Sequence, residues 1–215
     1  MKWTGVISAI TTAFKADDTV DYEFVAQHAR WQVEQGVDGI VALGSLGEAA
    51  TLTFDEKIGI LKTFVGALGG KPVVAGIAAL STAEAVALAK AAEQAGCAGL
   101  MVLPPYVYST DWREMKAHID ALLRATRLSC MLYNNPPAYK TDFLPAQIAE
   151  LAQQHDNLQA VKESSGDVRR VTAVKALCGD RLAVFPGLDD MVVEGVTWFE
   201  FQGSRDVRRR LAVTA

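Results

Sequence analysis

One lysine inside an apolar stretch is the residue of this chain best suited to covalent chemistry. Lys162 lies in the run 158–164, where alternation along a strand would place it on one face with Ala160 and Ser164. Because burial disfavours the charged ammonium, we expect the pKa of this amine to fall. A neutral amine is the nucleophile that forms a Schiff base with a carbonyl substrate. The alternative is a structural lysine whose amine reaches solvent from the end of the strand.

Further polar groups follow the predicted strands at other points of the chain. Gly44 and Gly47 enclose Ser45 and Leu46 in a turn, and glycines at this spacing allow backbone N–H groups to face an anion such as a carboxylate. Tyr133 ends a predicted strand, where its hydroxyl can serve as an acid or a base. The alternative for Tyr133 is a core tyrosine whose hydroxyl is satisfied locally. Each of these signals is weak alone.

The elements that position these residues alternate in type along the chain. Seven short apolar or β-branched runs are separated by helical patterns, which predicts a parallel α/β sheet. The chain contains neither a GxGxxG turn nor a Walker loop, so we predict a TIM (β/α)8 barrel rather than a nucleotide-binding doubly wound sheet. In such a barrel, the residues that follow the strands meet at one end. The seven runs are 5–10, 38–43, 72–77, 99–103, 129–133, 158–162 and 181–185.

Helix-start signals lie between the predicted strands. Thr53 with Glu56, and Ser81 with Glu84, each match a capping box, in which each side chain accepts a hydrogen bond from the other residue's backbone N–H. Gly96 is suited to end the second of these helices. Further helices are predicted at 111–125 and 145–154, and from near Asp21 and Asp167.

Three segments together resemble the dihydrodipicolinate synthase/N-acetylneuraminate lyase family of Schiff-base aldolases. They are Gly44-Ser45-Leu46-Gly47-Glu48, Tyr133-Asn134-Asn135-Pro136 and Val161-Lys162-Glu163-Ser164, in the family's order and spacing, and the resemblance extends from residue 1 to about residue 195. It implies that Lys162 forms an imine with pyruvate or a related 2-oxo acid, and that Tyr133 moves protons. It also implies that the amides of Ser45 and Leu46 hold the substrate carboxylate, with the Ser45 hydroxyl assisting Tyr133.

Several positions depart from the pattern of the synthases in that family. Leu46 replaces a threonine, and Val107 stands where a second tyrosine from a neighbouring subunit is expected, with Tyr106 or Tyr108 as candidate substitutes. Ala138 stands where the synthases have an arginine for the carboxylate of their aldehyde substrate. Loss of that bidentate partner argues against the lysine-pathway substrate. We therefore expect a sibling activity, namely aldol cleavage or condensation, dehydration or deamination of a 2-oxo-acid derivative, with the synthase activity as an alternative.

The end of the chain does not match this resemblance. Residues 196–215 carry four arginines against two acids and lack the glycine-rich eighth strand that the family would have. We therefore predict a barrel domain over 1–195, incomplete at its C-terminus, and an atypical tail over 196–215 that arose by frameshift or truncation. The alternative is an unusual but genuine terminus. An open barrel would leave strand edges unpaired and let water reach Lys162. A catalytically impaired fragment, which binds a small carboxylate or joins intact subunits, is therefore a second hypothesis.

Composition argues against several functional classes. With a net charge of −4 at pH 7, this chain of 215 residues has no broad basic face for nucleic acid. No apolar stretch reaches the length of a membrane span and no signal peptide opens the chain, so we expect a cytoplasmic protein. The three cysteines and three histidines lack metal-ligand spacing, so we expect neither a metal nor a cofactor. The family resemblance implies a homo-oligomer, a tetramer in the family, and the tail leaves that assembly open.

Overall fold

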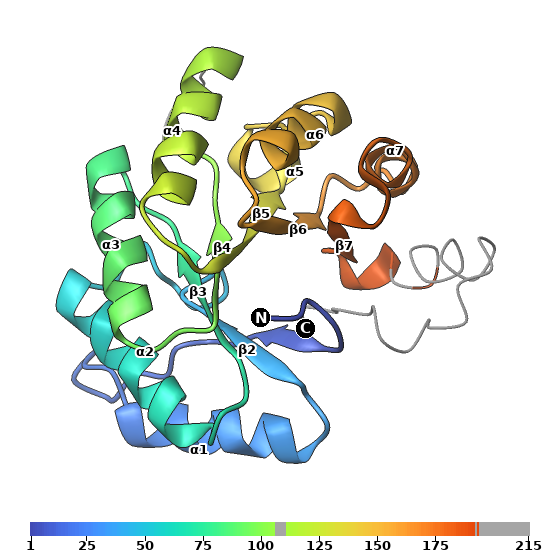
Figure 1. Cartoon of the computed structure of the whole chain (residues 1–215). Coiled ribbons are helices and arrows are strands. Elements are labelled where there is room, and N and C mark those ends of the chain that lie inside the picture. Colours follow the sequence, from blue (N-terminus) through green and yellow to red (C-terminus); the bar gives the residue numbers. More distant parts are fainter. Residues whose placement is uncertain (106–110, 192, 194–215) are drawn as a thin grey trace.

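The computed structural model describes residues 1–105, 111–191 and 193 (Figure 1). Tyr106, Val107 and Tyr108 lie outside the described residues, as do the predicted domain boundary at residue 195 and the tail that follows it. The three segments that carry the family resemblance lie within the described part of the chain.

Seven parallel strands form one sheet in sequence order, which confirms the predicted barrel topology for the described residues. The sheet curls and the helices lie outside it, as in seven units of a TIM (β/α)8 barrel (Figure 1). The first and last strands are the two ends of the sheet within this part of the chain. The strands are β1 (Ile7–Ala9), β2 (Gly39–Ala42), β3 (Val73–Ile77), β4 (Gly99–Val102), β5 (Ser129–Asn134), β6 (Leu158–Glu163) and β7 (Ala183–Pro186).

The helices connect successive strands, and each long one begins close to a predicted start signal. No helix in the described part of the chain combines the length and apolar character needed to cross a membrane. The helices are α1 (Tyr22–Glu34), α2 (Phe54–Ala67), α3 (Thr82–Gln94), α4 (Trp112–Arg124), α5 (Pro136–Tyr139), α6 (Pro145–Gln154) and α7 (Arg169–Cys178), with 3-10 turns at Gly179–Arg181 and Asp189–Met191.

The two predicted capping boxes have different outcomes. Thr53 and Glu56 form the complete reciprocal pair at the start of α2, as predicted. At the start of α3, the Ser81 hydroxyl accepts the N–H of Glu84, but the structure shows no return bond from the Glu84 carboxylate. That carboxylate instead lies 3.8 Å from the Lys57 amine on α2, so the prediction of a second complete box was wrong. An ion pair between neighbouring helices therefore takes the place of the second hydrogen bond of the box, while Ser81 still caps α3.

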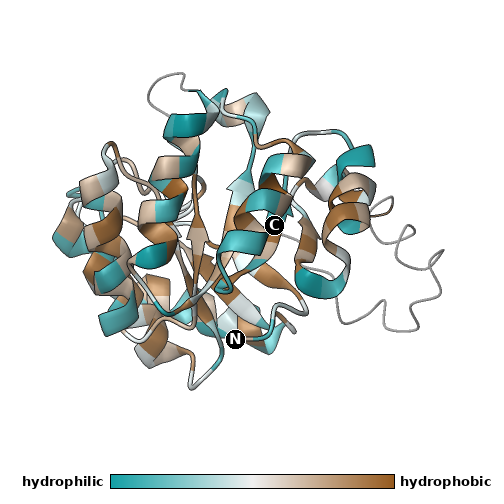
Figure 2. Cartoon of the chain, turned by 45° about the horizontal axis from the view of Figure 1, so that its top comes forward, coloured by the Kyte–Doolittle hydropathy of each residue, from teal (hydrophilic) through white to brown (hydrophobic). Residues whose placement is uncertain are grey.

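The sheet has a packed layer on each face. The larger apolar cluster lies between the strands and the helices and includes Ile40, Leu100 and Val161. The smaller cluster lies on the inner face and includes Val41 and Met131. Successive residues of a strand belong to different clusters, as Ile40 and Val41 do on β2. This alternation makes the strands apolar on both faces, while polar residues cover the outer surfaces of the helices (Figure 2).

A bulge in β6 sets which of its residues face inward. Cys130 on β5 pairs with Leu158, but the next residue, Met131, pairs with Ala160, so Gln159 is an extra residue in β6. Leu158 therefore belongs to the outer cluster and Ala160 to the inner one, although they are two residues apart. After the bulge, regular alternation places Lys162 on the inner face, two residues beyond Ala160.

The amino ends of the strands are closed on the inside by the N-terminal segment. Trp3 is buried among the inner cluster and packs edge-on against Phe185 of β7, with ring centroids 6.1 Å apart. Its indole N–H donates to the Ser129 hydroxyl at 2.6 Å, and that hydroxyl donates to the side-chain oxygen of Gln159, the bulge residue. Trp3 and Phe185 thus pack together within the inner cluster, and a surface cavity of about 550 Å³ lies beside Trp3, Gln159 and Ala183.

Candidate active site

Tyr133 and Lys162 lie side by side on the inner face of the sheet. They occupy paired register positions of the parallel strands β5 and β6. The Lys162 amine lies 4.6 Å from the centre of the Tyr133 ring, and the two residues are 5% and 6% exposed, respectively. The sequence singled out both residues separately, and the fold brings them into contact at the carboxyl ends of their strands. Their chemical roles stay predictions.

A buried polar network holds the ends of β5 and β6 together. Asn134 has no exposed surface, and its amide donates to the carboxylate of Glu163 at 3.0 Å. The same side chain accepts the N–H of Phe143 at 2.9 Å, and the other Glu163 oxygen accepts the N–H of Ser165 at 2.7 Å. Because Asn134 follows Tyr133 and Glu163 follows Lys162, this network fixes the backbone on which the two candidate catalytic side chains stand.

An ion pair extends this network toward the surface. Arg170 on α7 holds both carboxylate oxygens of Asp142, one at 2.7 Å, and Asp142 also accepts from the Asn134 amide. The Arg170 guanidinium holds the pKa of Asp142 below its usual value, and the Asn134 bond acts in the same direction, although partial burial opposes both. The loop after β5 is therefore tied to the helix after β6.

The hydroxyl of Tyr133 has a defined partner on its own loop. The Asn135 side-chain amide donates to it at 2.9 Å, so the phenol oxygen accepts and its own proton is left to donate elsewhere. A second tyrosine, Tyr139 of α5, packs edge-on against the Tyr133 ring, with centroids 5.8 Å apart. Tyr139 also shares a hydrogen bond with the Ser45 hydroxyl.

The turn after β2 presents two backbone amides at the same end of the sheet. Within the turn, the N–H groups of Gly47 and Glu48 bond the carbonyls of Gly44 and Ser45, at 3.1 and 3.2 Å. The N–H groups of Ser45 and Leu46 have no acceptor in the described part of the chain. Two amides without an acceptor are available for a ligand, and their role in binding a carboxylate stays a prediction.

Backbone strain marks both ends of this turn. Leu43 and Glu48 have φ values of +59° and +53°, in the left-handed region that non-glycine residues rarely adopt. Each costs on the order of 1–2 kcal/mol and is held by the surrounding structure. The Thr12 hydroxyl contributes to that restraint, because it donates to the carbonyl of Gly47 at 2.7 Å.

A small cavity lies beside the turn after β2. The cavity measures about 210 Å³ and is lined by Gly44, Ser45, Glu48, Ala49, Ala50, Ala78, Leu103 and Tyr139. Lys162 and Tyr133 are not part of that lining, but Tyr139 both lines the cavity and contacts the Tyr133 ring.

Gly187 leaves room for the Lys162 side chain. A Cβ at Gly187 would lie 2.9 Å from the lysine Cγ, so only glycine fits there without a shift.

One hydroxyl next to Lys162 is buried and has no partner. Ser164 has no exposed surface, and its Oγ makes no hydrogen bond within the described part of the chain. A Cβ at Gly187 would lie 1.9 Å from this oxygen, which places the hydroxyl beside the Lys162 stem. A buried hydroxyl without a partner costs about 1–3 kcal/mol, which a bound polar ligand would recover.

The predicted site residues fall into three groups. Lys162 and Tyr133 are in contact, while Gly44, Ser45, Leu46 and Gly47 form the turn, which connects to them through Tyr139. Tyr106 lies outside the described residues.

The contacts of Tyr139 and Asn135 with Tyr133 were not predicted from the sequence. Asn135 caps α5 by accepting the N–H of Ala138, and Pro136 occupies the first helical position. An asparagine before a proline is a helix-start signal that would have placed Tyr139 on a short helix next to the site.

A family model and curated relatives match this chain. The model of the dihydrodipicolinate synthetase family matches residues 2–198. A 4-hydroxy-tetrahydrodipicolinate synthase from Desulforamulus reducens is 35% identical over 189 residues, which cover 87% of this chain and 64% of the relative. The chain therefore spans slightly less than two thirds of the length of that relative.

Solved structures of similar proteins have the same fold. The chloride-inhibited dihydrodipicolinate synthase from Acinetobacter baumannii, solved in complex with pyruvate, has a TM-score of 0.90 at 28% identity and covers 100% of this chain and 70% of that one. A monomeric dihydrodipicolinate synthase variant has a TM-score of 0.86 at 25% identity, over 99% of this chain and 69% of that one. The backbone arrangement described above is therefore shared with these proteins.

Proposed function

Because the chain belongs to the dihydrodipicolinate synthetase family, we propose that it is a lyase that forms a Schiff base between Lys162 and a 2-oxo acid such as pyruvate. The observation that carries the proposal is the pairing of a buried lysine with a buried tyrosine at the carboxyl ends of adjacent barrel strands. Pyruvate is the ligand of one similar structure, and this chain has groups suited to its carbonyl and its carboxylate.

Each group has a defined part in the proposed reaction. The Lys162 amine attacks the carbonyl carbon while the Tyr133 hydroxyl gives its proton to the carbonyl oxygen, which forms a carbinolamine. The Tyr133 oxygen then takes a proton from the attached nitrogen and gives it to the new hydroxyl group. That hydroxyl leaves as water, and the protonated imine remains. The protonated imine then withdraws electrons from the neighbouring carbon, so that a proton or a carbon–carbon bond there can break. The Asn135 amide orients the Tyr133 hydroxyl for these transfers.

The turn after β2 would hold the other end of the substrate. The N–H groups of Ser45 and Leu46 are two donors placed for one carboxylate, and the strained φ values at Leu43 and Glu48 keep them in that arrangement before a ligand binds. The Ser164 hydroxyl is a further donor beside the lysine. A fixed carboxylate would keep the carbonyl carbon within reach of the amine, and such positioning supplies much of the rate in reactions of this type.

One position on α5 bears on the second substrate: Ala138 is exposed and offers no cation for a second carboxylate. We therefore favour aldol cleavage or condensation, dehydration or deamination of a monocarboxylic 2-oxo-acid derivative over the synthase reaction. An assay for pyruvate release from 2-oxo-acid derivatives, run beside an assay for condensation with the aldehyde substrate of the synthases, separates these reactions.

Covalent trapping tests the proposal. The protein is incubated with pyruvate and borohydride, digested, and searched for a peptide with the mass of a reduced pyruvate adduct. We expect the adduct on the peptide that contains Lys162, its loss in Lys162→Met, and its retention in Lys57→Met, which removes another buried lysine. A protein that pyruvate stabilises against unfolding without forming an adduct would instead support the impaired fragment that only binds a carboxylate. A protein that forms no adduct and that pyruvate does not stabilise would contradict the proposed function.

A further inference from the structure

Tyr139 is a second phenol at the site, and it comes from the same chain as Tyr133. We propose that Tyr139 is a positioning residue, which directs the Ser45 hydroxyl and fixes the Tyr133 ring, and so completes a set of three hydroxyls within one chain. The proposal rests on the proposed function, because these hydroxyls matter only if Tyr133 moves a proton. The juxtaposition that carries it is the Tyr139–Ser45 hydrogen bond together with the edge-on contact between the two tyrosine rings.

The backbone around Tyr139 is held at both ends of its short helix. Asn135 caps the start of α5, and Pro136 has the backbone angle that a first helical residue needs. Lys140 ends the helix in the left-handed region, with φ at +59°, and its N–H bonds the carbonyl of Pro136. The Thr141 hydroxyl then ties the chain to the carbonyl of Pro105, after β4, at 2.7 Å. Tyr139 is therefore presented by a restrained loop, not by a free one.

The hydrogen bond to Ser45 has a consequence for the direction of the Ser45 proton. A serine hydroxyl has one proton, so if Tyr139 donates to Ser45, the serine proton points to another acceptor in the site. Ser45 and Tyr139 both line the cavity of about 210 Å³ beside the carboxylate-binding turn. That acceptor is then the substrate carboxylate or an oxygen of the reacting centre. Removal of the Tyr139 hydroxyl frees the serine to rotate.

The ring contact acts on the other hydroxyl. Tyr133 is held by Asn135 at its oxygen and by the Tyr139 ring at its edge, while the Lys162 amine lies over its face. Each contact removes a direction in which the Tyr133 ring could turn. The phenol that gives and receives the proton is thereby kept in one orientation relative to the amine that forms the imine.

A packing role for Tyr139 makes different predictions from a positioning role. Packing depends on the ring, which Tyr139→Phe keeps, whereas the proposed function of the hydroxyl is lost in that variant. If the two hydroxyls act as one unit, Ser45→Ala and Tyr139→Phe together should cost no more than the more damaging single change. Independent roles would make the two effects multiply.

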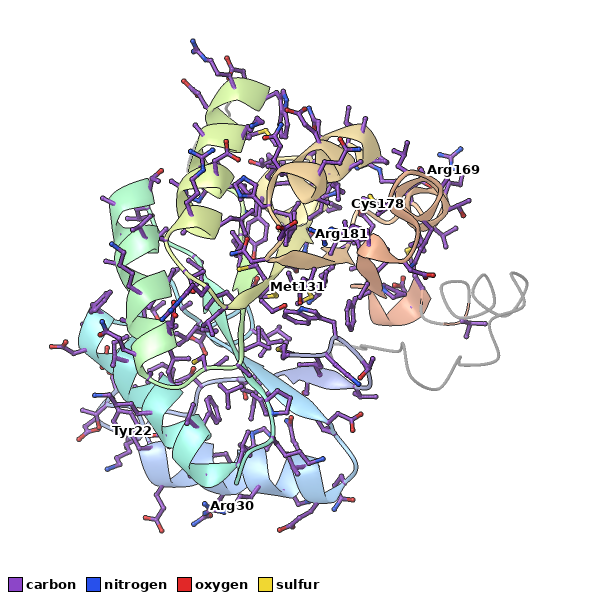
Figure 3. The ribbon with its side chains drawn as sticks, viewed as in Figure 1. Tyr22, Arg30, Met131, Arg169, Cys178 and Arg181 are labelled. Carbon is purple, nitrogen blue, oxygen red and sulfur yellow. The ribbon has the colours of Figure 1, made fainter. Side chains whose placement is uncertain are left out.

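The test measures the single-turnover rate of pyruvate trapping by borohydride from pH 5.5 to 9, in wild type, both single variants and the double variant. Tyr22→Phe is the matched control, since Tyr22 lies on α1, far from Met131 and the inner face of β5 (Figure 3). We expect Tyr139→Phe to lower the maximal rate about 10- to 100-fold and to change the pH profile, with thermal stability retained. We expect Tyr22→Phe to match wild type.

Three results would overturn the inference, and they are distinguishable. If wild type traps pyruvate on Lys162 and Tyr139→Phe has the rate and pH profile of the Tyr22→Phe control, the Tyr139 hydroxyl does not position Ser45, the set of three hydroxyls is wrong, and the proposed function stands. Multiplying effects of the Ser45 and Tyr139 changes would also reject the coupled set of hydroxyls. If wild type traps no pyruvate, the proposed function fails and the inference fails with it.

Discussion

Two lysines of this chain are equally buried but lie in different surroundings. Lys57 and Lys162 are each 5% exposed. Lys57 stands on α2, in the layer of helices, with its amine 3.8 Å from the carboxylate of Glu84 on α3. Lys162 stands on the inner face of the barrel, with its amine over the ring of Tyr133. Burial alone therefore does not distinguish the candidate nucleophile.

The difference lies in the neighbours that each fold position provides. The carboxylate of Glu84 on the neighbouring helix pairs with the Lys57 amine, which suits this lysine to a structural role. At the carboxyl ends of parallel strands, loops from several units converge. Lys162 lies there beside the Tyr133 phenol and the buried Ser164 hydroxyl, and Tyr139 links Tyr133 to the turn after β2. Reactivity is expected where the fold gathers groups that can transfer protons.

Displacement of the Lys162 stem should have the largest effect. In Gly187→Ala, the new Cβ would lie 1.9 Å from the Ser164 Oγ and 2.9 Å from the Lys162 Cγ, so the lysine must move. We expect pyruvate trapping to slow about 100-fold, the cost of misplacing a reacting group by about 1 Å. The control is Gly66→Ala on α2, where a Cβ meets nothing within 4 Å and the trapping rate should not change. Equal rates in the two variants would show that the Lys162 position is not critical.

Loss of the network behind the site should lower both stability and reactivity. In Asn134→Ala, the buried Glu163 carboxylate and the Phe143 N–H lose their hydrogen bonds to Asn134. We expect this loss to lower the free energy of unfolding by about 2–4 kcal/mol. We also expect trapping to slow about 10-fold, because the ends of β5 and β6 lose their alignment. Urea unfolding and trapping rates measure the two effects.

Asn157→Ala is the matched control for that experiment. Asn157 donates to the carbonyls of Leu123 and Thr126, at the amino end of β6, so its loss should destabilise the fold without slowing the trapping reaction. An equal loss of trapping in the two asparagine variants would mean that stability alone, not alignment at the site, governs the reaction.

The Asp142–Arg170 pair should make a smaller, pH-dependent contribution. The folded-state pKa of Asp142 is lowered, chiefly by Arg170, so its stabilisation is present above the unfolded pKa and is lost as pH falls through the folded pKa. Since Asp142 is only partly buried, we expect Asp142→Asn to lower the free energy of unfolding by about 1 kcal/mol at pH 7. The difference from wild type should shrink as pH falls below the ordinary pKa of an aspartate, about 3.9, and disappear below the lowered folded-state pKa. A difference that is constant from pH 7 to this range would exclude the ion pair as its cause.

Removal of Lys57 should have the smallest effect. Its partner Glu84 has a side chain that is 41% exposed, so water can solvate the carboxylate when the amine is lost. We expect Lys57→Met to change the free energy of unfolding by less than about 1 kcal/mol in urea unfolding. A much larger loss would show that this lysine is a major structural element and would sharpen the contrast with Lys162.

The strands could be predicted because two packed layers constrain them. Each of the seven apolar runs became a strand, since both faces of a parallel barrel sheet are buried and a continuous apolar run suffices to mark it. Lys162 and Tyr133 were identifiable for the same reason, because a polar residue in such a run has no solvated face to occupy. Their direct pairing also required the register of β5 against β6, which depends on the bulge at Gln159. No local pattern in the sequence indicates that bulge.

Tertiary contacts account for what the sequence did not reveal. Glu84 matched a capping box, but an ion pair with Lys57 on another helix competes for its carboxylate. Tyr139 lies 94 residues from Ser45 along the chain, so their hydrogen bond follows only from the curling of the sheet. The Asn134–Glu163 bond likewise joins two strands, and neither residue alone indicates it.

We propose that its surroundings, and not its burial, make Lys162 the nucleophile. This proposal is tested by the fraction of each lysine that carries a reduced pyruvate adduct in one sample of wild-type protein treated with pyruvate and borohydride. We expect near-complete modification of Lys162 and none of Lys57, although both are 5% exposed. Equal modification of the two lysines, or modification of Lys57 alone, would contradict it.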